Sequence, residues 1–186
     1  AEMTVRLPDS EDATPSPEQW PDLSLLTRHI IDTHHHYVRT ALPSITAGLH
    51  QLVSQAGADH PELVRVREIF VALGGELIAH MTKEEQILFP YIDELAGARR
   101  LGTTPPPSPF GTIANPVRMM EEDHEEALGQ VQRLRELTHG YSTPADGTAD
   151  HHRCLSELAA FDADLQRHTT IENTVLFPQA LDLEDG

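Results

Sequence analysis

Two stretches of this chain nearly repeat each other, eighty-eight residues apart. The first is His80-Met81-Thr82-Lys83-Glu84-Glu85-Gln86-Ile87-Leu88-Phe89-Pro90, and the second is His168-Thr169-Thr170-Ile171-Glu172-Asn173-Thr174-Val175-Leu176-Phe177-Pro178. Both have the pattern His-x3-Glu-x3-Leu-Phe-Pro. Residues four apart on an α-helix lie on one face, with Cβ atoms roughly 5–6 Å apart, so each copy directs an imidazole and a carboxylate the same way. One such pair is common on a solvated helix face, but two copies that both continue into Leu-Phe-Pro indicate a repeated structural element.

The composition is typical of one soluble globular domain. The chain has 186 residues, of which 39% are hydrophobic and 23% charged. Its formal charge of −17 argues against nucleic-acid and anionic-membrane partners. A single cysteine, Cys154, rules out an intramolecular disulfide, and neither a signal peptide nor a membrane-spanning run is recognisable. These features predict a cytoplasmic protein. Twelve histidines are many for this length, and imidazole is the commonest metal ligand.

The chain shows four segments in which core-facing residues recur at alternating steps of four and three, as in a heptad seam. The seam residues are Ile31, His35, Val38, Leu42, Ile45, Leu49, Leu52 and Ala56; Leu63, Val66, Phe70, Leu73, Leu77, His80, Glu84, Ile87 and Tyr91; Val117, Met120, His124, Ala127, Val131 and Leu134; and Cys154, Leu158, Phe161, Leu165, His168, Glu172 and Val175. The predicted fold is all-α, an antiparallel up-down-up-down four-helix bundle over residues 22–182. Residues 1–21 are expected to form a flexible, acidic, proline-rich tail, and Pro43 to kink the first helix.

Six polar residues lie on these seams instead of on the wet faces, and every helix contributes at least one. They are His35, His80, Glu84, His124, His168 and Glu172. A buried hydrogen-bond network would explain any one of them, but the whole set is better explained by metal ions, because buried carboxylates need partners. Glu84 and Glu172, on repeat-related helices, are well placed to bridge two metals. Imidazole and carboxylate without thiolate favour iron or manganese over a structural zinc.

These motifs resemble the hemerythrin-like (HHE) di-iron proteins of the repair-of-iron-centres family. Thr33-His34-His35-His36-Tyr37, Leu42-Pro43 and Glu122-Asp123-His124-Glu125 add to the likeness, which covers roughly residues 23–181. The resemblance implies a pair of non-haem iron ions with an oxo or hydroxo bridge. It also implies that Glu84 and Glu172 bridge the irons and that terminal histidines come from all four helices, with His35 as the ligand from the first.

The sequence departs from the family pattern at two places. The family has a further ligand histidine near the end of the first helix, where this chain has Ala56. Since Ala56 continues the seam, it is expected to face the site without a donor, to leave one iron less well held, and to be replaced as a ligand by water or His60. The family's longer members also carry an amino-terminal domain with paired cysteines, and no such pair occurs in this sequence.

Residues beside the seams are expected to have ordinary structural roles. His34 and His36 flank the seam and are expected either to be solvated or to contact the ligands from outside, Glu85 lies off the seam, and the acidic run ending at Asp123 is expected to form a solvated face. His151 is expected on the surface.

The resemblance favours a di-iron protein of the nitrosative and oxidative stress response, which binds O2, NO or peroxide or supplies iron for iron–sulfur cluster repair. Its expected partners are a small diatomic or peroxide ligand and iron–sulfur proteins. Two alternatives remain open: a reversible O2 or NO binder or sensor without turnover, and a di-iron peroxidase or ferroxidase.

Overall fold

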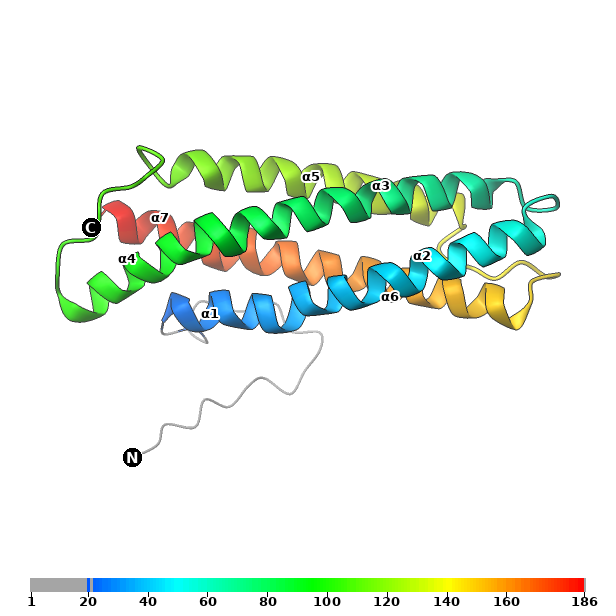
Figure 1. Cartoon of the computed structure of the whole chain (residues 1–186), viewed down its shortest axis with the longest axis horizontal. Helices are drawn as coiled ribbons and strands as arrows, with labels where there is room; N and C mark the ends of the chain where they lie inside the picture. Colours follow the sequence, from blue (N-terminus) through cyan, green and yellow to red (C-terminus); the bar gives the residue numbers. More distant parts are fainter. Residues whose placement is uncertain (1–19, 21, 186) are drawn as a thin grey trace, which may run out of the picture.

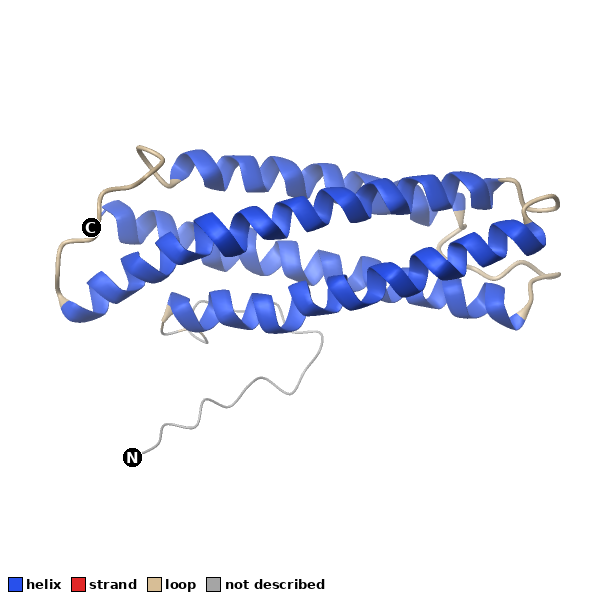
Figure 2. Ribbon diagram, in the orientation of Figure 1, coloured by secondary structure: helices blue, strands red, loops and turns tan. Residues whose placement is uncertain are grey.

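The computed structural model describes Trp20 and residues 22–185, and within this part of the chain it contains helices and no β-strand (Figure 2). Four long helical rods run along the molecule (Figure 1). In chain order the elements are α1 (Leu23–Ile30), η2 (Ile31–His35) and α2 (His36–Ala56) in the first rod; α3 (Glu62–Lys83), η3 (Glu84–Leu88) and α4 (Phe89–Leu101) in the second; α5 (Ala114–Leu137) in the third; and α6 (Ala149–Ile171), η4 (Glu172–Leu176) and α7 (Phe177–Asp185) in the fourth.

The rods alternate in direction and close a ring, which confirms the predicted antiparallel four-helix bundle. α2 packs against both α3 and α6, and α5 packs against the same two helices from the other side. Connections between rods lie at the two ends of the bundle, as Figure 1 shows. None of the helices in the described part of the chain is long and apolar enough to cross a membrane.

The interior consists of two apolar clusters with a polar layer between them. One cluster is built from α2, α3 and the facing halves of α5 and α6, and includes Phe70 and Phe161. The other lies at the end of the bundle that holds α1, α4 and α7, and includes Phe89 and Phe177. Along each rod, the histidines and glutamates of the seam lie at the boundary between the two apolar clusters. The apolar residues therefore enclose the polar layer from both ends.

Three of the four rods contain a single π-helical turn, and each turn includes or adjoins seam histidines or glutamates. In such a turn the backbone hydrogen bond spans five residues instead of four. The N–H of Phe89 donates to the carbonyl of Glu84, and the N–H of Phe177 to that of Glu172. A proline follows each phenylalanine, and a proline offers no N–H and clashes with the carbonyl four residues before it in a regular α-helix. The repeated Glu-x3-Leu-Phe-Pro therefore has a local reason to widen the helix.

In the second rod the extra residue of the π turn shifts the seam by one position, whereas Val175, at the matching position of the fourth rod, is buried as predicted. Ile87, expected on the core side, is 51% exposed, whereas Leu88 is 2% exposed. In the first rod Ile30 is fully buried, and Ile31 is only partly so. The seam prediction at Ile87 was wrong for this reason, because steps of four and three assume an unbroken α-helix, while Ile31 is partly buried against the same apolar cluster as Leu88.

Helix ends follow ordinary capping chemistry. The carboxylate of Asp22 accepts from the backbone N–H of Ser24 at 2.9 Å and caps α1. Thr148 caps α6 in the same way through His151 N–H, and Gly102 ends α4 in the left-handed conformation that glycine adopts freely. α2 continues as a helix through Pro43. Of the tail predicted for residues 1–21, residues 1–19 and 21 lie outside the described part, while Trp20 is buried against the α1 end of the bundle.

Candidate metal centre

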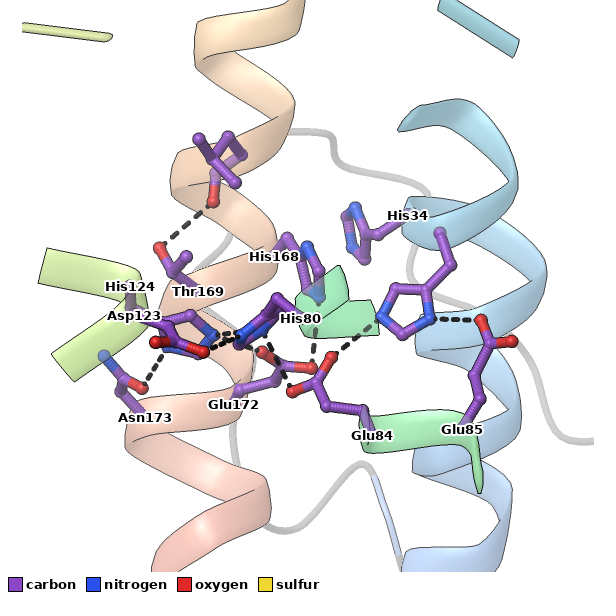
Figure 3. A network of polar contacts seen from close by, with 12 residues as sticks. His34, His80, Glu84, Glu85, Asp123, His124, His168, Thr169, Glu172 and Asn173 are labelled. Carbon is purple, nitrogen blue, oxygen red and sulfur yellow. Dashed lines mark hydrogen bonds and ion pairs between the residues drawn. The ribbon is translucent and has the colours of Figure 1, made fainter. Parts of the chain in front are cut away.

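The polar layer is closed to solvent. The carboxylates of Glu84 and Glu172 and the ring of His35 have no exposed surface, and the rings of His80, His124 and His168 are almost as fully buried. Figure 3 shows the two glutamates side by side with His80, His124 and His168 gathered around them. All six seam residues predicted as ligands therefore meet in one place.

Each oxygen of Glu84 faces a different histidine. Oε2 lies 3.3 Å from Nε2 of His35, and Oε1 lies 3.3 Å from Nε2 of His80. Because His35 belongs to the first rod and His80 to the second, one carboxylate spans two imidazoles that come from separate helices.

Glu172 repeats this arrangement on the opposite side. Its Oε1 lies 3.1 Å from Nε2 of His168, and its Oε2 lies 3.0 Å from Nε2 of His124. The two carboxylates thus define two groups of donors, and each group combines one oxygen from each glutamate with two imidazoles. The groups are His35, Glu84, His168 and Glu172, and His80, Glu84, His124 and Glu172, with the donor atoms of each within 4.8 Å of one another.

The donor set fits a metal ion better than it fits a hydrogen-bond network. Nε2 of His35, both oxygens of Glu84 and Oε2 of Glu172 are buried without a hydrogen-bond partner in the described part of the chain, which is costly for polar atoms. Nε2 of His80 and Nε2 of His124 are 3.1 Å apart, and a cation between them, a proton or a metal ion, removes the repulsion of two lone pairs. Buried carboxylates with neutral imidazoles are donors that iron accepts.

Three of the four histidines have an oxygen that accepts a hydrogen bond from the outer ring nitrogen, Nδ1; we call these oxygens the outer acceptors. They fix the tautomer in which Nε2 carries a lone pair toward the centre. The pairs, with their N···O distances, are His35 with Glu85 at 2.7 Å, His80 with Asp123 at 3.3 Å and His124 with Asn173 at 2.8 Å.

The expectation that Asp123 belongs to a solvated face was therefore wrong, and Glu85, which was expected only to lie off the seam, also contacts a predicted ligand. Each of the three acceptor residues adjoins a seam ligand in the sequence, but it contacts a histidine of the neighbouring rod. The helical spacing within one rod does not predict such a contact.

The charges of the centre shift the pKa values of its members. Burial raises the pKa of Glu172, but the nearby imidazoles of His168 and His124 outweigh it and hold that pKa well below its usual range. Burial lowers the pKa of His80, yet the nearby carboxylate of Glu84, with further help from Glu172, raises it to about 9. The pKa of His35 is raised for the same reasons. Without metal, the centre therefore holds protons that a metal must displace.

The phenylalanines of the two repeats close the apolar end of the centre. The ring of Phe89 stacks on His35 at a centroid distance of 5.8 Å, and the ring of Phe177 stacks on His124 at 5.9 Å. Both rings are buried. The Leu-Phe-Pro ends of the repeats thus keep water away from one side of the donors.

The structure does not bring His60 or Ala56 to the centre. Ala56 ends α2, 21 residues after His35, and at about 1.5 Å per helical residue this separation is about 30 Å. Nε2 of His60 lies 3.2 Å from Asp146 at that far end. The expectation of a donor vacancy at Ala56 is therefore contradicted, because both donor groups contain two histidines.

His151, which was expected on the surface, is instead buried, with its ring centroid 5.3 Å from that of His60.

Comparison with known proteins assigns the chain to a family. The model of the hemerythrin HHE cation-binding domain matches residues 26–180, so this protein belongs to that family, and the family implies iron binding. The chain is also similar to the iron-sulfur cluster repair protein YtfE of Salmonella paratyphi B (strain ATCC BAA-1250 / SPB7) and of Salmonella newport (strain SL254). Each is 31% identical over 154 residues, which make up 82% of this chain and 64% of the relative. The chain thus spans less than two thirds of the length of these relatives.

Proposed function

We propose that the centre holds two iron ions. His35 and His168 would bind one ion, His80 and His124 the other, and Glu84 and Glu172 would bridge them. The observation that carries this proposal is that each glutamate presents one oxygen to each pair of histidines, at 3.0–3.3 Å from the imidazole nitrogens. Facing helices that supply bridging carboxylates and terminal imidazoles are the usual protein frame for two irons.

The chain supplies four protein donors to each ion and prepares them for binding. The outer acceptors hold the imidazoles in the tautomer that ligates, and the stacked phenylalanines exclude water from one side. Iron bound there would supply ferrous–ferric redox chemistry and coordination positions open to a small ligand.

The role that we propose is the supply of iron for iron–sulfur cluster repair under nitrosative or oxidative stress, in the cytoplasm. The proposal is supported by the similarity to YtfE, whose name states iron-sulfur cluster repair for the relatives. The partner would then be an iron–sulfur protein that has lost its cluster, and the iron would be the cargo. Carboxylate bridges suit this role, because Glu84 and Glu172 can hold ions that a chelating acceptor still removes.

A second candidate is a binder of O2, NO or peroxide. With only two histidines and two shared carboxylates in each donor group, a six-coordinate iron would keep positions free for such a ligand. A peroxidase or ferroxidase would be the catalytic form of this candidate.

Iron transfer tests the proposal. The iron-loaded protein is mixed without air with a ferredoxin from which the cluster has been removed, together with sulfide, and the return of cluster absorption is followed. Glu84→Gln removes a bridging charge, and Glu121→Gln, on the exposed face of α5, is the matched control. We expect wild type and Glu121→Gln to restore the cluster and Glu84→Gln to bind and deliver much less iron. Turnover of hydrogen peroxide without iron transfer would favour the peroxidase instead.

A further inference from the structure

The outer acceptors follow a rule around the bundle. Glu85 is the chain neighbour of Glu84 and reaches back to the first rod; Asp123 is the neighbour of His124 and reaches back to the second; Asn173 is the neighbour of Glu172 and reaches back to the third. Each residue beside a proposed ligand thus serves the histidine of the preceding rod. The same rule requires a residue beside His35 on the first rod to serve His168 on the fourth.

His34 occupies that fourth position, and it offers no acceptor. Its ring lies parallel to the ring of His168, with a centroid distance of 5.3 Å and an interplanar angle of 2°. Its Nδ1 donates instead to the buried carboxylate of Asp164 at 3.0 Å. Within the described residues no group accepts a hydrogen bond from Nδ1 of His168, although that nitrogen is buried. Figure 3 shows His34 beside His168.

The two donor groups are therefore supported unequally by outer acceptors. An outer acceptor orients the imidazole and raises its basicity, and its loss typically costs about 10–100-fold in metal affinity. Both histidines of the His80 and His124 pair have one. In the other pair only His35 has one. Both carboxylate acceptors are also shared with a cation, Glu85 with Arg39 at 2.8 Å and Asp123 with Lys83 at 2.7 Å, so the difference between the pairs lies at His168.

We propose that the ion between His35 and His168 is the one that the protein releases, while the ion between His80 and His124 is retained longer. This inference rests on the proposed two-iron centre and adds which of the two positions delivers iron. The ring of His34, held by Asp164, keeps His168 in place by stacking without strengthening it as a ligand.

Stepwise removal of ferrous iron tests the inference. Protein loaded with two ferrous ions is mixed without air with excess ferrozine, and the coloured complex is followed with time. We expect two phases of equal amplitude, with rates about 10–100-fold apart.

Three variants assign the phases to positions. Glu85→Ala removes the acceptor of His35 and should speed only the fast phase. Asp123→Ala removes the acceptor of His80 and should speed only the slow phase, so that the two phases approach each other. Both side chains are partly exposed, so the variants should fold. Glu121→Ala, exposed on the same helix as Asp123, is the control and should change neither phase.

The outcomes separate this inference from the proposed function. Two bound ions that leave in a single phase would overturn the inference and leave the two-iron centre standing. The same holds if Asp123→Ala speeds the fast phase and Glu85→Ala the slow one. A protein that binds fewer than two ions at saturation would overturn the two-iron centre, and the inference with it.

Discussion

Leu88 and Ile87 give a matched pair of substitutions that tests the π turn in the second rod. Leu88 is 2% exposed and packs in the apolar cluster beside the metal centre, whereas Ile87 is 51% exposed. Truncation of a buried leucine to alanine costs about 2–5 kcal/mol of unfolding free energy. Truncation of an exposed side chain usually changes it by less than about 0.5 kcal/mol. For a domain of this size 1 kcal/mol corresponds to about 2–4 °C in melting temperature, so Leu88→Ala should lower it by about 4–20 °C.

The measurement is thermal unfolding followed by circular dichroism. It compares Leu88→Ala, Ile87→Ala and wild type at matched iron content. We expect Ile87→Ala to melt within about 2 °C of wild type. A regular α-helix through this segment would bury Ile87 instead and reverse the order. If Ile87→Ala were the more damaging of the two, the register shift that places Leu88 in the core would be refuted.

Two further predictions follow from the charges around the centre and from the far end of the bundle. Because the charge of Glu84 helps to raise the pKa of His80 to about 9 against the effect of burial, and because only the neutral imidazole ligates, binding of ferrous iron should release protons. Its affinity should then fall about tenfold per pH unit for each proton displaced as the pH is lowered from 7.5 to 6.5; pH-independent binding would contradict the proposed ligand. The hydroxyl of Tyr141 donates to the buried Asp162 at 2.8 Å, so Tyr141→Phe should lower the free energy of unfolding in urea by about 1–3 kcal/mol. Tyr37→Phe, at a partly exposed position, should lower it by less. Equal losses of unfolding free energy in the two variants would show that the Tyr141 hydroxyl contributes nothing.

The periodicity and the repeat were sufficient to predict the fold and the meeting of six donors. Four heptad seams leave few arrangements other than a bundle, and the spacing of His-x3-Glu places both side chains on one face of a helix. His80 and Glu84 stay four apart whether or not the helix widens after them. The positions of Ile87 and Leu88 depend on one extra residue in a turn, and the sequence marks it only through the proline that follows.

Contacts between rods were beyond the reach of the sequence. Glu85, Asp123 and Asn173 look like surface residues along their own helices, and their roles depend on how the neighbouring rod is rotated. The expectation for Ala56 failed for a simpler reason. Ala56 lies on the face that the seam predicts, but 21 helical residues separate it from His35, about 30 Å at roughly 1.5 Å per residue, so it lies at the far end of the bundle.

A crystal structure of the iron-loaded protein, with anomalous scattering measured at the iron absorption edge, tests the central claim most directly. We predict two iron peaks of comparable height, one among His35, His168, Glu84 and Glu172, the other among His80, His124 and the same two glutamates. A single peak, or iron located away from Glu84 and Glu172, would contradict the proposed two-iron centre.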